Sequence, residues 1–99
     1  MEDFINQLNK AFENRVRLGV MSILMVNDEI DFNNLKKLLN QTDGNLASHL
    51  SALEKLEYIS VNKQFVGRKP NTTYKITQTG KIEFDNHLKA LESFIKQIQ

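Results

Sequence analysis

The sequence contains no cysteine and has only one proline and four glycines among its 99 residues. Without cysteine the chain cannot form a disulfide, a thiolate zinc site, a catalytic thiol or a thiol-based sensor. The composition fits a reducing compartment, so we expect a cytoplasmic protein. The lone proline, Pro70, falls in a predicted hairpin loop, where its lack of an amide donor does little harm.

Long apolar runs are absent as well. No run approaches the roughly 20 residues that a membrane span needs, so we expect no membrane contact. The first 12 residues carry Glu2 and Asp3 and no long apolar core, which argues against a secretory signal. A chain of this length suits one domain, 1–99, with one modest core. We therefore do not expect an enzyme with a deep pocket of its own, although a dimer could share one.

Acidic and basic residues are unevenly distributed. The net charge is only +1, which by itself gives little reason to expect a nucleic-acid partner. Residues 1–33 contain six acidic and three basic residues. Residues 61–81 contain no acidic residue and five basic ones, namely Lys63, Arg68, Lys69, Lys75 and Lys81. The positive charge is thus concentrated in one short segment.

Apolar residues at helical spacing predict four helices before residue 58. Their ranges are 3–12, 14–26, 32–40 and 43–57. Asp31 is expected to cap the third helix, and Thr42 or Asp43 the fourth. The inward-facing leucines of the third helix are Leu35, Leu38 and Leu39. The fourth helix carries one apolar stripe, Leu46, Leu50, Leu53 and Leu56. The stripe predicts that this side of the helix is buried.

Alternating residues over 58–66 and 72–77 predict two strands joined by the loop Gly67–Asn71. Ile59, Val61 and Phe65 share one face and are expected to pack inward. Lys63 has the same parity as these apolar residues, so its exposure stays open.

The last predicted helix begins at a cap, Thr77 or Thr79, and runs to about Ile98. It carries a heptad seam of Phe84, Leu88, Leu91, Ile95 and Ile98. About 20 helical residues span roughly 30 Å, which is longer than a small domain covers. We therefore expect a homodimer in which 1–13 and 78–99 are the dimerisation helices. From the N-terminal segment the seam is joined by Phe4, Leu8 and Phe12. The alternative is that the seam packs on its own domain.

The order of elements predicts a mainly α fold with a small β-hairpin (α+β), arranged as a winged helix-turn-helix. The helix-turn-helix would be 32–57 and the wing 58–77. Burial of the leucine stripe leaves a polar face on the helix 43–57. The residues of this face that are expected to contact DNA bases are Thr42, Asp43, Asn45, Ser48 and His49. The hairpin would reach the DNA backbone or minor groove through Lys63, Arg68, Lys69 and Asn71.

From about Asn14 to Leu91, roughly three quarters of the chain, the sequence resembles MarR/ArsR-like winged-helix transcriptional regulators, most closely their compact stand-alone DNA-binding domains. The runs that carry this resemblance are NRVRL at 14–18, TDGNLASHL at 42–50, LEKLEYI at 53–59, FVGRKP at 65–70, and TYKIT at 73–77 followed by Gly80. The resemblance implies that 43–57 is the recognition helix and 58–77 the wing. It also implies that the terminal helices form a symmetric dimer on double-stranded DNA.

Other interpretations of these residues stay open at this point. The polar helix face and the basic tip could simply be solvated. His49 could bind a metal, but His87 is the only other histidine, so we expect no metal and no cofactor. Ser48 and His49 point about 100° apart on a helix and cannot act as a catalytic pair. A winged-helix protein-interaction module and a ligand-responsive sensor remain alternatives, although no residue indicates a particular small-molecule effector.

Overall fold

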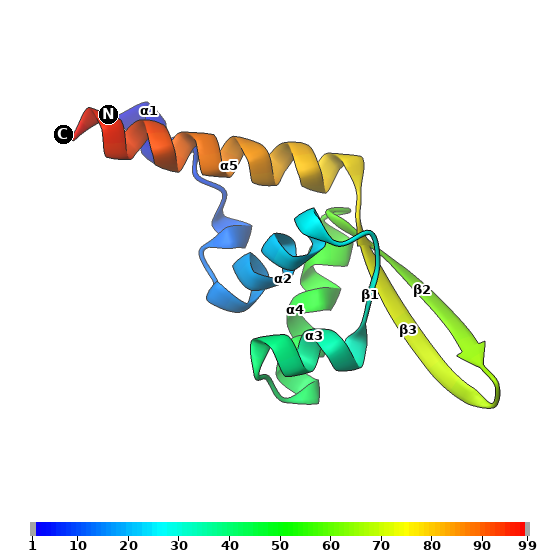
Figure 1. Cartoon of the computed structure of the whole chain (residues 1–99). Coiled ribbons are helices and arrows are strands. Elements are labelled where there is room, and N and C mark those ends of the chain that lie inside the picture. The colour runs from blue at the N-terminus through cyan, green and yellow to red at the C-terminus, as the bar shows by residue number, and fades with distance from the viewer. Residues whose placement is uncertain (1, 99) are drawn as a thin grey trace.

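The computed structural model describes the backbone of residues 2–98 and the side chains of residues 5–98 (Figure 1). Its elements in chain order are α1 (Glu2–Gln7), η1 (Lys10–Phe12), α2 (Arg15–Val26), β1 (Ile30–Asp31), α3 (Phe32–Leu39), α4 (Asp43–Lys55), β2 (Ile59–Val66), β3 (Lys69–Ile76) and α5 (Gln78–Gln97). The predicted fold class is confirmed: the molecule is mainly helical, with one small antiparallel sheet in the order β1-β3-β2.

Three predicted helix caps are confirmed. Asp31 accepts a hydrogen bond from the backbone N–H of Asn34 at the start of α3. Thr42 accepts one from the N–H of Asn45 at the start of α4, over 3.2 Å. Thr77 caps α5 through the N–H of Gly80, over 2.9 Å. Each cap satisfies an amide that the helix itself leaves free, which is why these helices begin where they do.

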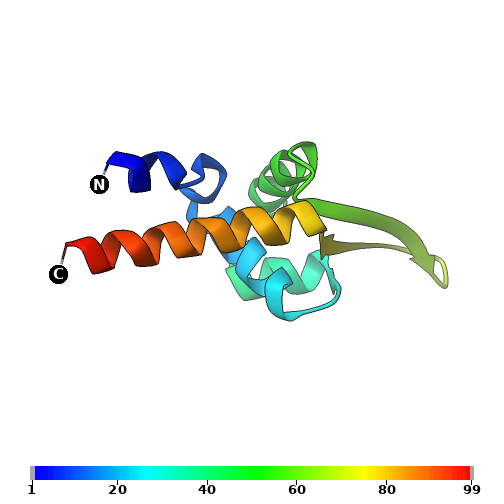
Figure 2. The same cartoon turned by 90° about the horizontal axis from the view of Figure 1, so that it is seen from above.

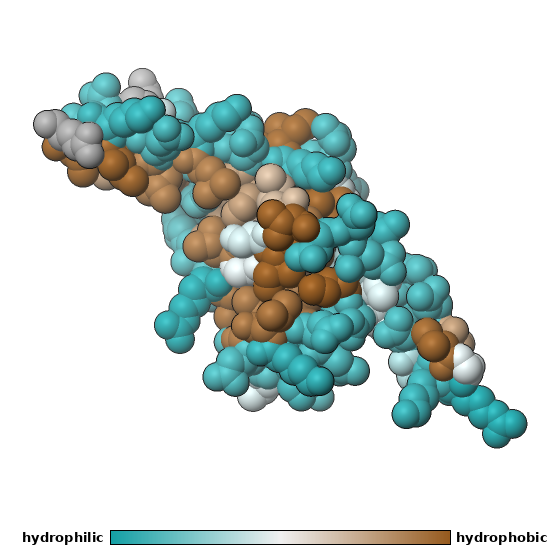
Figure 3. All heavy atoms as spheres, in the orientation of Figure 1, coloured by the Kyte–Doolittle hydropathy of each residue, from teal (hydrophilic) through white to brown (hydrophobic). Residues whose placement is uncertain are grey.

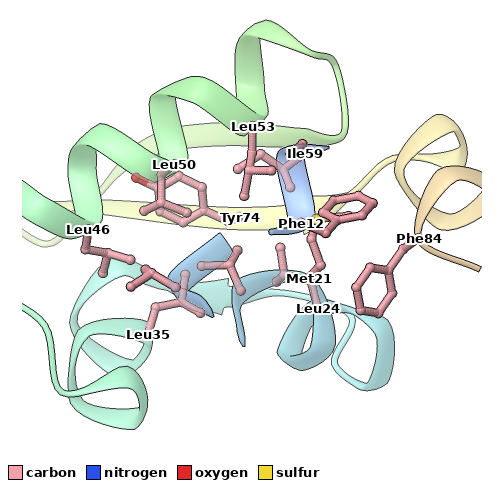
Figure 4. Packing of buried hydrophobic residues seen from close by; sticks show 13 residues of the cluster. Phe12, Met21, Leu24, Leu35, Leu46, Leu50, Leu53, Ile59, Tyr74 and Phe84 are labelled. Atoms are coloured by element: carbon pink, nitrogen blue, oxygen red, sulfur yellow. The ribbon is translucent and has the colours of Figure 1, made fainter. Parts of the chain in front are cut away.

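The core lies between α2, α3, α4 and the inner face of the sheet. Leu46, Leu50 and Leu53 of α4 point toward Leu35 of α3 and the apolar residues of α2 (Figure 4). All three α4 leucines are at most 2% exposed. This packing fixes the rotation of α4 about its axis, and so decides which of its side chains face outward.

Two leucines depart from the predicted burial. Leu56 is 46% exposed, because α4 ends at Lys55 and Glu57 turns the chain away with a left-handed φ of 64°. Leu38 is 63% exposed, because it lies on the outer side of the short helix α3. The expectations that Leu56 completes the buried stripe and that Leu38 faces inward are therefore wrong.

The predicted continuous helix over residues 3–12 is also wrong. It is interrupted between α1 and η1, where Asn9 adopts an extended conformation. The side chain of Asn9 accepts a hydrogen bond from the N–H of Ala11, so it starts a new short helix. After this break Phe12 points into the core, where its ring lies 5.2 Å from that of Phe84 and 5.5 Å from that of Tyr58.

The hairpin is longer and its turn tighter than predicted. Strands β2 and β3 pair without interruption from Ile59–Ile76 to Val66–Lys69. Only Gly67 and Arg68 remain for the turn, and Gly67 has the positive φ (66°) that a type II′ turn requires at its first central residue. Pro70 and Asn71 therefore belong to β3, which corrects the predicted loop Gly67–Asn71. Beyond its short pairing with β1 at residues 73–74, this edge of β3 has no neighbouring strand within the described residues, so a proline is tolerated there.

The far half of the hairpin extends past the helical body (Figure 1). Ile59 is buried, yet Phe65 on the same face is 74% exposed. The expectation that Phe65 packs inward is therefore wrong, because no helix of the described chain lies opposite this part of the strand. Seen from above in Figure 2, the hairpin and α5 project from the body in opposite directions, and the molecule measures 55 × 25 × 21 Å.

Candidate nucleic-acid interface

The predicted base-contacting residues of α4 lie outside its buried leucine stripe, with Ser48 on the opposite side, Asn45 toward one flank and His49 at the border with α2. Asn45 and Ser48 are exposed, and His49 is half-buried beside α2. None of these side chains is packed inside the fold. The helix therefore presents short hydrogen-bonding groups on an open surface, as close approach to a major groove requires.

His49 is held by a contact from another helix. The guanidinium Nε of Arg17 on α2 donates a hydrogen bond to His49 Nδ1 over 3.0 Å. Burial, and to a lesser extent the positive charge of Arg17, lower the pKa of His49 below its ordinary 6.5. The ring is therefore neutral at pH 7, and because Nδ1 is the acceptor, its proton resides on Nε2. His49 thus presents an N–H donor on the nitrogen that Arg17 does not occupy.

The amino end of α4 combines a cap with a local ion pair. The Thr42 hydroxyl oxygen caps the helix by accepting from the N–H of Asn45, and its own O–H can still donate. The Asp43 carboxylate is exposed and lies 2.7 Å from the ammonium of Lys36 on α3. Asn45 Nδ2 donates to the side-chain oxygen of Gln41, and within the described residues the Asn45 oxygen accepts no hydrogen bond. Lys36 offsets the negative charge of Asp43 at the helix end that would approach phosphates.

The hairpin β2–β3, which we call the wing, carries the predicted cations at and near its tip. Lys63, Arg68 and Lys69 are exposed, and within the described side chains no carboxylate pairs with any of them. Asn71 is half-buried on β3 and lines an open groove of about 580 Å³ beside the start of α3. Three cations are thus available to an anionic partner, whereas Asn71 lies back from the tip.

The polar side of α4 and the wing belong to one continuous unit. The chain passes from α4 into β2 within three residues, and Leu53 of α4 lies beside Ile59 of β2 (Figure 4). A sequence model of the winged helix DNA-binding domain matches residues 16–95, the part of the chain that holds both. The chain belongs to this winged helix family.

Two relatives of the winged helix protein each cover at least nine tenths of its length. It is 33% identical over 90 residues to an uncharacterized protein of Methanocaldococcus jannaschii, covering 91% of this chain and 98% of that one. It is similar to the structure of a transcriptional regulator homologue from Pyrococcus horikoshii, with 30% identity, a TM-score of 0.89, and coverage of 100% and 99% of the two chains. The predicted resemblance to transcriptional regulators of this fold is confirmed.

The MarR family shares the fold of this winged helix protein at lower identity. A MarR-family transcriptional regulator from Silicibacter pomeroyi superposes with a TM-score of 0.68 at 14% identity, covering 99% of this chain and 68% of that one. The family and the fold are those of DNA-binding regulators. Among the helices of the described residues, none is long and apolar enough to cross a membrane. The described side chains also contain no cluster of three potential metal ligands.

Some of the residues predicted for the dimer interface are buried in the core, and others are exposed. Phe12 and Phe84 are 2% and 3% exposed in the winged helix core, so they have almost no surface to offer a partner, and their assignment is corrected. Leu8 is half-buried, and the side chain of Phe4 lies outside the described residues. The remaining members form an exposed apolar face on α5 (Figure 3), namely Leu88, Leu91, Ile95 and Ile98, each 41–59% exposed.

Two features of the winged helix surface could not be found from sequence. Arg17 contacts His49 across 32 residues of sequence, and no local pattern signals such a contact. Phe65 and Val66 follow an ordinary strand alternation, which does not reveal where the body of the protein ends. The sequence signal for them is their position next to Gly67 and the two basic residues that follow it.

Proposed function

We propose that this winged helix protein is a sequence-specific transcriptional regulator that binds duplex DNA as a homodimer. Helix α4 would lie in the major groove, and the wing on the phosphate backbone or in the minor groove. One observation carries the proposal. α4 buries Leu46, Leu50 and Leu53 and exposes its polar side, next to a wing whose three cations have no carboxylate partner within the described part of the chain.

The polar side of α4 supports base readout. Asn45 and Ser48 are exposed, and their short side chains let the helix approach base edges closely, while the half-buried His49 lies at the border with α2. The Nε2–H of His49 is a hydrogen-bond donor, which suits the acceptor edge of guanine, N7 and O6. Arg17 fixes this choice, because a ring whose Nδ1 already accepts a hydrogen bond cannot turn its acceptor toward the base.

The wing supports backbone contact. Arg68 lies in the turn, Lys69 follows it, and Lys63 lies further back on the neighbouring strand. Cations that reach phosphates release counterions from DNA, so they strengthen binding without selecting a sequence. A narrow minor groove additionally attracts arginine and lysine.

The exposed apolar face of α5 supports the homodimer. Four large apolar side chains at 41–59% exposure on one helix favour a partner that covers them. A symmetric pair would place two α4 helices in successive major grooves about 34 Å apart, which predicts a near-palindromic site.

Two pairs of alanine variants test the proposed roles of the wing in phosphate contact and of α4 in base readout. We expect Arg68→Ala and Lys69→Ala to weaken binding about equally for all sequences and to reduce the salt slope of log Kd by about one each. Asn45→Ala and His49→Ala should instead relax sequence preference, by about 1–3 kcal/mol where the lost contact is bidentate, as Asn45 can make, and by about 0.5–1.5 kcal/mol for the single hydrogen bond that His49 Nε2–H can donate. Fluorescence anisotropy with matched and mismatched duplexes at several salt concentrations measures both effects.

Equal effects from the two pairs would contradict the assigned roles. Absence of any salt-sensitive complex at micromolar protein would contradict DNA binding itself. That outcome would favour the alternative that the winged helix is a protein-interaction module. Asp28→Asn, which removes an exposed charge between α2 and β1, outside α4, the wing and the terminal helices, is the control and should leave sequence preference and salt slope close to those of wild type.

A further inference from the structure

The wing tip carries large apolar side chains that the protein's own core does not use. Phe65 is 74% exposed and Val66 is 62% exposed. Figure 3 shows an isolated apolar patch near the tip, surrounded by hydrophilic side chains. Exposed aromatic and branched residues at the end of a projecting hairpin contribute nothing to folding, and they indicate a surface that a partner covers.

The backbone holds Phe65 in a fixed place. Phe65 pairs with Pro70 across the hairpin, one step back from the Val66–Lys69 pair beside the turn. In a two-residue hairpin this second pair is the non-hydrogen-bonded kind, in which opposite side chains approach each other most closely. Pro70 is therefore the direct cross-strand neighbour of Phe65 on the same face of the hairpin. The pairing continues to the turn, so the tip is stiff rather than a loose loop.

The direction of Phe65 follows from strand alternation. Ile59, Val61 and Phe65 lie on one face of β2, and Ile59 on that face is buried in the core with α4. Phe65 therefore emerges from the same face of the hairpin that packs against the helices. Val66 lies on the opposite face, which makes it a natural comparison for Phe65.

The positively charged residues around Phe65 favour an anionic partner. Lys63, Arg68 and Lys69 lie within two to four residues of it, and residues 61–81 contain no acidic residue. A purely apolar protein surface would have to desolvate these cations without compensation. Duplex DNA offers phosphates for the cations and apolar sugar and base surfaces between them, which matches both parts of the tip.

We propose that the wing tip inserts Phe65 as an apolar wedge into the minor groove beside the site of α4, with Pro70 against the sugar wall and Arg68 and Lys69 on the flanking phosphates. This inference rests on the proposed function and adds the mode of wing contact. Apolar side chains that enter the minor groove partly unstack a base step and bend the duplex. The cost is lowest at flexible pyrimidine–purine steps, so such steps are expected where the wing lands.

Phe65→Ala tests the wedge, and its exposure predicts that the variant folds with an unchanged melting temperature. On a duplex that wild type selects from a random pool, we expect affinity to fall about tenfold while the salt slope stays the same, because the substitution removes no charge. A 2-aminopurine placed at the base step under the wing should become more fluorescent when wild type binds, because that step is unstacked. We expect Phe65→Ala to lose this increase. Phe65→Trp, which keeps a large apolar ring, should retain the wild-type affinity and the fluorescence increase. Val66→Ala should change neither the affinity nor the fluorescence increase.

The outcomes separate this inference from the function on which it rests. If wild type forms no salt-sensitive complex with DNA, the proposed function fails. If wild type binds and Phe65→Ala keeps its affinity and fluorescence change, the wedge is wrong and the regulator assignment stands. If Phe65→Ala binds DNA normally but loses binding to anionic phospholipid vesicles that wild type binds, the tip is a lipid contact and the wedge is again wrong.

Discussion

Asn9 connects three parts of the molecule through its backbone and side chain. Its N–H donates to Nδ1 of His87 on α5 over 3.0 Å, and its Nδ2 donates to the hydroxyl of Tyr58 at the base of the wing, also over 3.0 Å. Its Oδ1 caps η1. His87 accepts this hydrogen bond only while its ring is neutral, so the attachment of the N-terminal segment to α5 depends on the protonation state of one buried histidine.

The stability of the fold is therefore expected to fall in mild acid. Burial lowers the pKa of His87 below 6.5, and Glu13 opposes this shift only in part. The pKa of His49 is lowered as well, by burial and by Arg17. Because both groups bind protons more readily in the unfolded chain, their contribution is complete above pH 6.5 and is lost as pH falls through the folded-state pKa values. Urea unfolding between pH 8 and pH 5 measures this loss.

Variants without the imidazoles give the control for that measurement. His87→Gln keeps an acceptor oxygen near Asn9 but cannot titrate, and His49→Gln removes the second titrating ring. In the double variant we expect a markedly smaller change in unfolding free energy between pH 7 and pH 5.5 than in wild type. An unchanged pH dependence would show that other groups carry it.

At the scale of elements, the junction between the wing and α5 is closely packed. The Thr77 hydroxyl donates to the carbonyl of Glu57 over 2.6 Å, and the Thr77 N–H donates to the carbonyl of Tyr58 over 3.0 Å. A Cβ at Gly80 would lie 2.1 Å from that same Tyr58 oxygen. Only glycine lets α5 start this close to the backbone of the connection between α4 and β2, and this contact helps set the direction of α5 relative to the wing.

Gly80→Ala is accordingly expected to destabilise the protein by about 1–3 kcal/mol or more, since the clash is with backbone rather than with a flexible side chain. Gly44→Ala is the matched substitution, because a Cβ there meets nothing within 4 Å. In an exposed helix it should leave the stability unchanged or raise it by up to about 1 kcal/mol. Thermal and urea unfolding of both variants check this, and similar stabilities for the two would contradict the packing at the junction.

Elements with strong local signals could be predicted from the sequence, whereas those set by tertiary contacts could not. The caps at Asp31, Thr42 and Thr77 and the leucines of α4 depend on neighbours three or four residues away, and the predictions for the caps and for three of the four leucines are confirmed. The break at Asn9 depends on partners at Tyr58 and in α5, far along the chain. The exposure of Phe65 depends on where the helices opposite the strand end.

In the candidate site, too, features that depend on local sequence could be predicted, and features that depend on tertiary contacts could not. The exposed polar side of α4 follows from the buried stripe, and the cationic wing follows from local charge. The pairing of Arg17 with His49 needs α2 and α4 to be packed together first. The removal of Phe12 and Phe84 from the predicted dimer seam has the same origin, because heptad spacing does not distinguish a partner helix from the protein's own core.

At the scale of the whole molecule, the proposed interface and the exposed part of α5 lie on opposite sides of the body. The wing projects one way and α5 the other, with α1 packed along α5 and both described ends of the chain on that side (Figure 2). If the far half of α5 pairs with a second copy, the DNA-facing surfaces of both protomers stay free. Dimerisation through α5 and readout through α4 together then predict a bound sequence with two related halves.

Selection of bound duplexes from a random pool tests that prediction most directly, with wild type, Ile95→Glu and the control Gln97→Glu, which adds the same charge at an exposed polar position of α5. Wild type and the control should enrich two inverted half-sites with centres about 10 base pairs apart. Ile95→Glu, which sediments as a monomer in the expected case, should enrich at most a single weak half-site. Failure of wild type to enrich any sequence, or enrichment of one unpaired motif by all three proteins, would contradict the account.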